Sequence, residues 1–152
     1  MKRYLPLIVL VALSALLPLA VGVDDGRGWL MDFMGYFLVN FTMLKLFDLP
    51  GFAKGFARYD LLAQRWKGWG FIYPFLELAL GFSSLGRWNP DVTQIAMIAL
   101  MGFGAIGVFT ALKKGLNIDC ACMGTSLKVP LSTVAIVEDL GMVILAALLL
   151  IS

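Results

Sequence analysis

Histidine is absent from the 152-residue chain, and cysteine occurs only twice. The absence of histidine removes the commonest metal ligand and the commonest general base, so chemistry must rest on cysteine, methionine or carboxylate groups. Charged residues make up only 14% of the chain, whereas about a quarter is usual in soluble domains. The net charge of +2 gives no basic patch of the kind that binds nucleic acid. With 61% hydrophobic residues, the composition excludes disorder and an ordinary soluble fold, and it predicts a protein of the lipid bilayer.

Five apolar runs have the length, or nearly the length, of about 20 residues that a bilayer-spanning helix needs. They comprise residues 4–23, 29–47, 69–85, 92–112 and 130–151. The alternation typical of strands is missing from them, and a helix satisfies its own backbone polar groups within lipid. We therefore predict an all-α fold, a polytopic transmembrane helix bundle of five spans that forms one domain over residues 1–152.

The first run has a second interpretation. Lys2 and Arg3 precede it, and Ala20, Val21 and Gly22 resemble the small-residue site at which a secretory signal is cleaved. Because the run is longer than a typical signal core, we favour a retained helix over residues 4–23. Cleavage of residues 1–22 would leave four spans and the same orientation for the rest.

Basic residues are distributed unevenly between the two sides of this topology. With the N-terminus in the cytoplasm, only Arg27 and Arg87 fall on the outer side. The inner side collects Lys2, Arg3, Lys45, Lys54, Arg58, Arg65, Lys67, Lys113, Lys114 and Lys128. Under the positive-inside rule, this bias predicts a multi-pass protein of the bacterial inner membrane. Its N-terminus and the cysteine loop 113–129 are expected in the cytoplasm, and its C-terminus in the periplasm.

The connection between the second and third runs mixes aromatic and basic residues. Phe52, Phe56, Tyr59, Leu62 and Trp66 recur at helical spacing among lysines and arginines. This pattern is typical of a helix that lies in the membrane interface, so we predict such a helix between Phe52 and Trp69.

The two cysteines are candidates for chemistry because they are separated by a single residue. Cys120 and Cys122 lie in a polar loop, next to Asp119 and Met123. One interpretation is thiol-disulfide exchange, because a disulfide closed over so small a loop is strained and therefore oxidising. Another is binding of a soft metal such as Cu(I) by Cys120, Cys122 and Met123, whereas zinc requires four ligands. The third is an assembly subunit whose thiols are incidental.

Carboxylates within the apolar runs form a second candidate site. Glu77, Glu138 and Asp139 are expensive to place in lipid, so they are expected to be paired or functional, and we take them as candidate proton-relay groups. Glu77 and Glu138 each lie about 12 Å along their runs at 1.5 Å per residue, a depth at which they meet. Lys45 either extends to the headgroups or pairs with one of these carboxylates. The alternative role for the set is to hold the helices together.

Residue spacing also predicts which helix faces look inward. Tyr73, Glu77, Gly81 and Ser84 share one face, and Asp32, Tyr36, Asn40 and Met43 share another. Small residues on the fourth run predict close helix packing: Gly102, Gly104, Gly107 and Ala111. Such a face is also compatible with an oligomer.

Four short motifs resemble the MauE/DoxX-like redox-associated membrane proteins, from about Met31 to the C-terminus. They are the run Leu44 to Asp48 with Phe52, the pair Tyr59 and Asp60, the run Tyr73 to Gly81 and the run Cys120 to Gly124. The resemblance implies a helical membrane protein engaged in thiol redox work. MauE-type members are thought to help thioredoxin-like partners handle disulfides during maturation of methylamine dehydrogenase. DoxX-type members accompany quinone-linked sulfur oxidation, so the resemblance is compatible with a quinone cofactor.

By this analogy Cys120 and Cys122 form the redox pair, and Lys45 and Glu77 occupy motif positions. Met123 departs from the family pattern, which often has phenylalanine there. A methionine at this position is compatible with a carrier of copper or mercury. We therefore expect a thiol-redox protein that exchanges electrons with a thioredoxin- or glutaredoxin-like partner. A cytoplasmic cysteine loop fits a cytosolic partner better than disulfide formation in an oxidising periplasm. The alternative is a carrier of a thiophilic metal, for which Met97, Met101 and Met142 extend a sulfur path.

Overall fold

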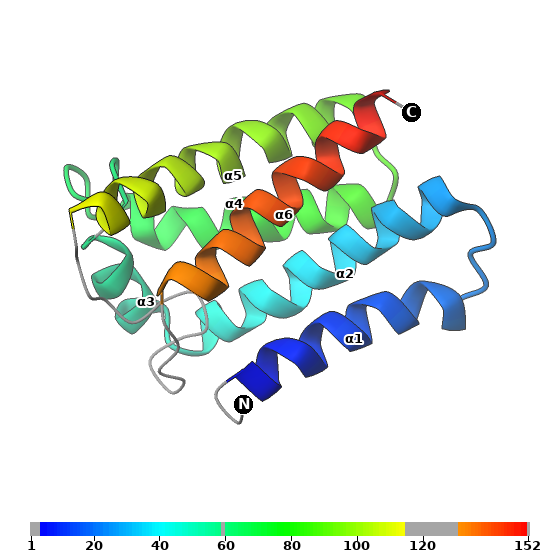
Figure 1. The fold of residues 1–152 in the computed structure, drawn as a ribbon, viewed down its shortest axis with the longest axis horizontal. Helices are drawn as coiled ribbons and strands as arrows, with labels where there is room; N and C mark the ends of the chain where they lie inside the picture. The colour runs from blue at the N-terminus through cyan, green and yellow to red at the C-terminus, as the bar shows by residue number, and fades with distance from the viewer. Residues whose placement is uncertain (1–3, 59, 115–130, 152) are drawn as a thin grey trace.

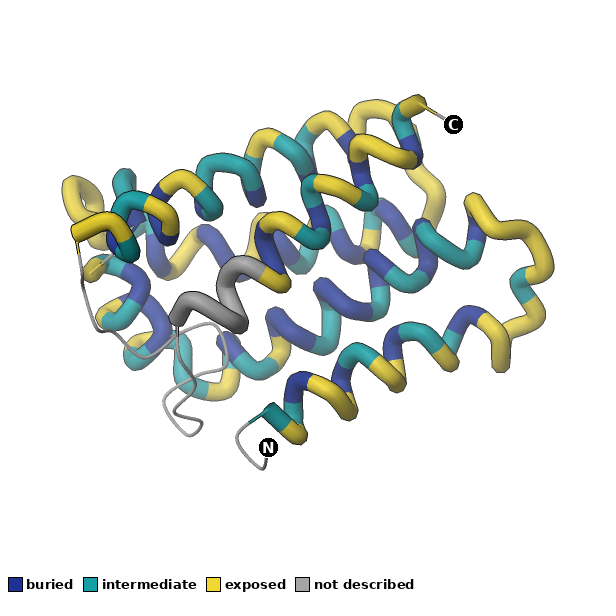
Figure 2. Tube along the Cα trace, viewed as in Figure 1, coloured by how far each residue is buried: buried dark blue, intermediate teal, exposed yellow. Residues whose placement is uncertain are grey.

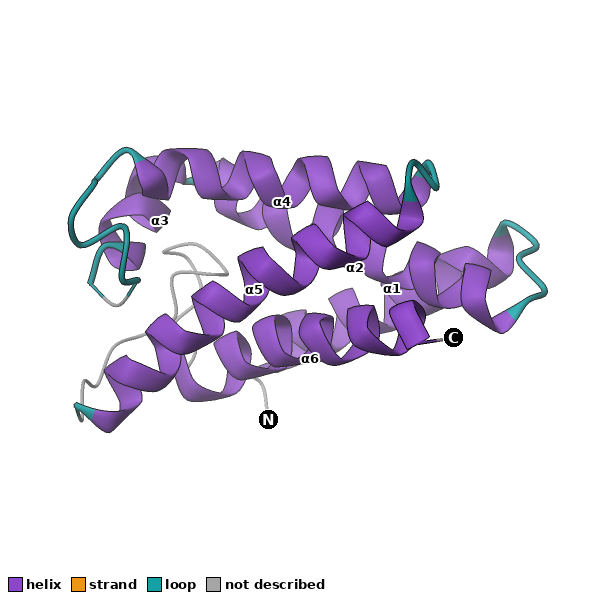
Figure 3. Ribbon diagram, turned by 90° about the horizontal axis from the view of Figure 1, so that it is seen from above, coloured by secondary structure: helices purple, strands orange, loops and turns teal. Residues whose placement is uncertain are grey.

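The computed structural model describes residues 4–58, 60–114 and 131–151, with side chains in the last range described from Val137 onward. These ranges contain helices and no strand (Figure 1; Figure 3). The helices are α1 (Leu5–Ala20), α2 (Gly26–Phe47), α3 (Leu49–Phe56), α4 (Trp69–Leu85), α5 (Pro90–Lys113) and α6 (Leu131–Ile151). The prediction of an all-α fold is therefore confirmed for the described part of the chain.

The five long helices run up and down in sequence order and form one bundle (Figure 1). The N-terminus, α3, the end of α5 and the start of α6 lie at one end of the bundle, which we call the α3 end. The α1–α2 and α4–α5 turns and the C-terminus lie at the opposite end. Helix α2 packs along α1 and α4, and α5 packs along α6.

The long helices coincide with the apolar runs, but the number of membrane spans stays a prediction. Among the described residues, α2 and α5 are long and apolar enough to cross a bilayer. Helix α1 has 16 residues and α4 has 17. At 1.5 Å per residue these reach about 25 Å, slightly less than the hydrocarbon thickness of about 30 Å.

Exposed positions run along the whole length of the bundle (Figure 2), and many of them carry large apolar side chains. Exposed large hydrophobic residues occur on every long helix, for example Leu13, Phe75, Ile95, Phe109 and Ile144. A soluble monomer rarely exposes so much contiguous apolar surface. This surface is the one expected of a protein surrounded by lipid.

Side-chain caps and prolines mark where the helices begin. The Asp25 carboxylate accepts a hydrogen bond from the Gly28 N–H at 2.8 Å and starts α2. Asp48 accepts from the Gly51 N–H at 3.2 Å and starts α3, which has a proline in its first turn. The Trp29 indole N–H donates to the Ala15 carbonyl at 3.1 Å and ties α2 to α1. The two carboxylates satisfy backbone N–H donors that the first turn of a helix leaves unpaired.

The predicted interfacial helix between Phe52 and Trp69 is wrong in its bounds and in its burial. Helix α3 ends at Phe56, and most of the segment up to α4 forms turns. The chain bends there because the Asp60 Oδ1 atom accepts from the N–H groups of Leu62 and Ala63, each at 3.0 Å. The aromatic side chains of Phe52 and Phe56 are buried in the bundle rather than lying on a membrane surface.

Two glycines allow α2 and α4 to approach each other closely. A Cβ atom added at Gly35 would lie 2.6 Å from Leu85 Cγ and 2.9 Å from the Gly81 carbonyl oxygen. A Cβ atom at Gly81 would lie 3.0 Å from Val39 Cγ2. This approach aligns the α2 and α4 faces that carry the buried charges described below.

We expect Gly35→Ala to lower the free energy of unfolding by about 1–3 kcal/mol, the usual cost of overpacking. The matched control is Gly102→Ala, because nothing lies within 4 Å of a Cβ at that helical position. The control should be neutral or more stable by up to about 1 kcal/mol, since alanine favours a helix over glycine. Unfolding in mixed detergent micelles measures both, and equal effects would contradict the close approach.

Candidate functional site

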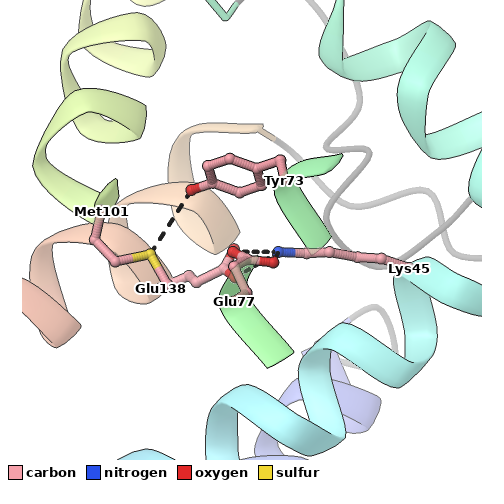
Figure 4. Close-up of polar contacts among 5 residues, drawn as sticks. All are labelled: Lys45, Tyr73, Glu77, Met101 and Glu138. Carbon is pink, nitrogen blue, oxygen red and sulfur yellow. Dashed lines mark hydrogen bonds and ion pairs between the residues drawn. The ribbon is translucent and has the colours of Figure 1, made fainter. Parts of the chain in front are cut away.

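Three charged side chains from three helices meet inside the bundle (Figure 4). Lys45 Nζ, from the last turn of α2, lies 2.8 and 2.6 Å from the two carboxylate oxygens of Glu77 on α4. The same nitrogen donates to Glu138 Oε1 on α6 at 2.8 Å. Lys45 is 1% exposed, Glu77 0% and Glu138 1%. We call these three residues the Lys45 cluster.

The cluster confirms one sequence-based expectation and decides between two alternatives that the sequence left open. Glu77 and Glu138 meet at one level, as their depths along the apolar runs predicted. Lys45 pairs with membrane carboxylates instead of extending to the headgroups. The inward face of α4 is also confirmed, because Tyr73, Glu77, Gly81 and Ser84 are all buried.

Aromatic rings surround the ammonium group of Lys45. Its Nζ atom lies 5.2 Å from the ring centre of Phe41, 5.5 Å from that of Phe52 and 5.6 Å from that of Tyr73. Rings at this distance stabilise a cation and exclude water from it. The contribution of α3, which supplies Phe52, was not predicted from the sequence. The regular spacing of Phe52 and Phe56 was the available clue, but we took it as the pattern of a helix on a membrane surface.

The electrostatics of the cluster require a proton or a further positive charge for neutrality. One ammonium group faces two carboxylates, and an unbalanced charge is expensive in a low-dielectric interior. A single proton held on either glutamate makes the cluster neutral. The arrangement can therefore hold a proton and release it while all three side chains stay in contact.

Asp139 and Tyr73 extend the polar groups from the cluster toward α5. The Tyr73 hydroxyl donates to Met101 Sδ at 3.7 Å (Figure 4). A Cβ added at Gly104 would lie 3.0 Å from the Tyr73 hydroxyl oxygen and 3.1 Å from Asp139 Oδ2. The absence of a side chain at Gly104 thus lets both polar groups reach the same place on α5. Glu138 and Asp139 point to different neighbours because adjacent helical residues differ by about 100° around the axis.

The inward face that we predicted on α2 is wrong in part. Met43 is 46% exposed, and Tyr36 and Asn40 are half-buried. The buried stripe of this helix consists of Met31, Met34, Leu38, Phe41 and Lys45, with a few neighbours. Asp32 is buried, but it pairs with Arg87 at 3.3 Å at the opposite end of the bundle. Polar spacing misled because the polar residues of α2 do not share one face: Thr42 and Lys45 are buried, whereas Asn40 is half-buried.

The predicted cysteine site lies outside the described residues, as do Cys120, Cys122 and Met123. The segment that contains them joins the end of α5 to the start of α6 at Leu131. Glu138 follows that start by seven residues, which corresponds to about 10 Å along the helix. Within the described ranges, no group of three or more Cys, Asp or Glu side chains is arranged to hold a metal ion.

An apolar groove of about 700 Å³ runs between α4 and α5. Leu76, Ala79 and Leu80 line it from α4, and Glu77 is not among its lining residues. The hydroxyl groups of Ser83 and Thr93, which also line it, bind each other at 2.7 Å. The groove suits a hydrocarbon chain, and a quinone cofactor stays a prediction.

Asp60 is a buried carboxyl group that belongs to one of the family-like motifs but had no predicted role. It follows α3, and its neighbours are the Ala63 and Leu62 N–H groups and the Trp69 indole. Burial raises the pKa of Asp60 above its ordinary value of 3.8, and these hydrogen-bond donors oppose the shift. The group holds together the turn that carries the chain from α3 into α4.

We expect Lys45→Met to lower the free energy of unfolding by about 3–5 kcal/mol, because it leaves two buried carboxylates without their cation. Lys54→Met is the control, since Lys54 is exposed, and it should change stability by less than about 0.5 kcal/mol. Unfolding in mixed micelles is the measurement. Adding Glu77→Gln and Glu138→Gln to Lys45→Met should restore part of the loss, because the triple variant buries no charge at the cluster.

Asp60 should make the stability of the protein depend on pH. A raised folded-state pKa means that stability is fully present below the ordinary value of 3.8 and is lost as pH rises through the folded-state value. Asp60→Asn keeps the oxygen that accepts from Leu62 and Ala63 and cannot ionise. We therefore expect its stability relative to wild type to increase as pH rises. The control is Asp91→Asn at an exposed position, and an equal trend in both variants would contradict the assignment.

Comparison with known proteins places these residues in a family. Residues 29–152 match the family model described as methylamine utilisation protein MauE. No curated protein and no solved structure matches the chain. The matched range begins near the start of α2 and includes the whole Lys45 cluster and both cysteines. Because it covers more than half of the sequence, the chain belongs to the MauE family of methylamine utilisation proteins.

Proposed function

We propose that the chain is a membrane thiol-redox protein in which Cys120 and Cys122 exchange a disulfide with a thioredoxin-like partner. In this proposal the Lys45 cluster takes up and returns a proton during the exchange. The observation that carries the proposal is the contact of Lys45 with carboxylates from two other helices in a fully buried site. Well-packed apolar side chains stabilise a bundle at least as well, so a buried ion cluster points to a role beyond packing.

The exchange balances in electrons and protons. A thiolate of one cysteine attacks the partner's disulfide, the S–S bond breaks, and the leaving sulfur takes the electron pair. The second cysteine then attacks the mixed disulfide, which closes the Cys120–Cys122 disulfide and releases the partner as a dithiol. Two electrons pass to the partner, and the two protons lost here equal the two that it gains. The reverse reaction gives a disulfide to the partner.

The position of the cluster supports its part in this exchange. Glu138 lies about 10 Å along α6 from the end of the cysteine segment. A thiol that ionises passes its proton to an acceptor, and the cluster offers one because two carboxylates share a single cation and repel each other. Asp139 and Tyr73 are the neighbouring groups through which a proton travels further. Lys113 and Lys114, exposed at the end of α5, favour the thiolate form by their charge.

The test is alkylation trapping of the full chain in nanodiscs after equilibration with thioredoxin at defined redox potentials. We expect a Cys120–Cys122 disulfide and a mixed disulfide with a single-cysteine thioredoxin variant. Both should be lost in Cys120→Ser/Cys122→Ser. Failure to trap either species at any potential would refute the redox function.

The role of the cluster is tested separately by the pH dependence of the exchange rate. Glu138→Gln should slow the exchange and flatten its pH profile, because the amide cannot take up a proton. Asp91→Asn, which alters an exposed carboxylate at the opposite end, should leave the profile unchanged. A Glu138→Gln variant with the wild-type profile would assign the cluster to structure alone.

Buried methionines support a second candidate, a carrier of a thiophilic metal such as copper or mercury. Met97, Met101 and Met142 all face the core, as a sulfur path requires. Methionine also fills irregular cores without any chemical role, which makes this candidate the weaker one. In this case Cys120→Ser/Cys122→Ser should abolish metal uptake into cells that express the chain, and unchanged uptake would exclude the carrier.

A further inference from the structure

Exposed basic side chains cover the α3 end of the bundle. One lies on α3, three follow it in the turns before α4, and two end α5. Helix α3 and the end of α5 lie at the same end of the bundle (Figure 1). We call this set the basic surface: Lys54, Arg58, Arg65, Lys67, Lys113 and Lys114. Among the described residues, none of them forms an ion pair with a carboxylate. The surface flanks the segment that carries the cysteines, because that segment follows directly after Lys114.

Carboxylates in this part of the molecule are withdrawn from the surface. Asp48 is half-buried and caps α3, and Asp60 is buried at its turn. Glu77 and Glu138 are used by Lys45. The described residues therefore leave no exposed acid at the α3 end. The positive-inside rule accounts for the lysines and arginines but gives acidic residues little weight, so it does not explain this withdrawal.

The opposite end of the bundle is different. Asp24, Asp25 and Asp91 are exposed there together with Arg27 and Arg87. Arg27 lies 4.0 Å from Asp91, and Arg87 pairs with Asp32. Among the described residues, exposed positive charge without exposed acidic neighbours is thus found at the α3 end, where a partner would meet the cysteines.

Part of the basic surface is held beyond the helix ends. Arg58, Arg65 and Lys67 lie in the turns between α3 and α4, and the Gln64 side-chain amide donates to the Arg58 carbonyl at 3.2 Å and braces them. Trp66, 52% exposed, lies among them. Tryptophan and arginine are enriched at the centres of protein interfaces, and a braced surface loses little entropy on binding. Lys113, by contrast, stays over the outward-facing Phe109 ring at 5.3 Å.

We propose that the basic surface docks a water-soluble dithiol protein whose own cysteines are surrounded by acidic residues. The inference rests on the proposed function, which requires such a partner, and adds what selects it. Complementary charge raises the association rate by about 10- to 1,000-fold at low ionic strength and orients the two molecules before contact. Partners with a neutral or basic surface around their cysteines are thereby disfavoured.

The test measures docking without disulfide exchange. The full chain carrying Cys120→Ser/Cys122→Ser is placed in nanodiscs of zwitterionic lipid. Its association with an acidic thioredoxin is followed by stopped-flow fluorescence from 20 to 500 mM salt. The same measurement uses a thioredoxin whose surface carboxylates near its cysteines have been changed to amides. Because no exchange occurs in this chain, the outcome is independent of the trapping test for the redox function.

We expect the acidic thioredoxin to associate at least tenfold faster than its amide version at low salt, with the difference lost at high salt. Arg58→Gln/Arg65→Gln/Lys67→Gln should remove that advantage, and Arg27→Gln should preserve it. These residues are exposed, so thermal unfolding of both variants should match that of the parent chain. An unchanged rate in the triple variant would overturn the proposal. So would a triple variant that loses only its binding to anionic phospholipid vesicles, which would assign the surface to lipid headgroups.

Discussion

Burial of the Lys45 ammonium group is the constraint on which the rest of the structure depends. An unpaired cation in an apolar bundle is too costly to persist, so α2 is held where carboxylates from α4 and α6 reach it. Those contacts fix how far each helix extends along its neighbours. The glycine contact between α2 and α4 is a close backbone approach that brings Lys45 and Glu77 to neighbouring faces. Helix α3 completes the site by laying Phe52 over the cation.

Electron and proton chemistry are separated along α6 in the function we propose. The cysteines precede the helix, and Glu138 and Asp139 lie two turns into it. Such a separation has a physical basis, since thiolate chemistry needs access to a water-soluble partner, whereas a proton held between buried carboxylates is protected from exchange with water. The sequence has few charged residues, and the charged residues inside the described bundle are grouped at a few places rather than scattered.

Hydropathy was sufficient to predict the long helices, and the cost of charge in lipid was sufficient to predict that Glu77 and Glu138 meet. Hydropathy was not sufficient to tell the inner face of a helix from its outer face, because both faces of a membrane helix are apolar. Asn40 and Met43 were placed inside because they share a helix face with the polar residues Asp32 and Tyr36, although the interior of α2 contains Phe41 and Lys45. The burial of Phe52 and of Asp60 depends on contacts between segments distant in sequence, which local spacing does not encode.

The charges around Lys45 also set a limit on how the bundle can work. Glu77 and Glu138 contact the same ammonium group, so the three side chains are neutral only with one proton or one further positive charge. Asp139, the next residue on α6, points in a different direction and lies against Gly104. Because Lys45 Nζ lies within 2.8 Å of both glutamates, it stays in contact with a carboxylate whichever of the two carries a proton.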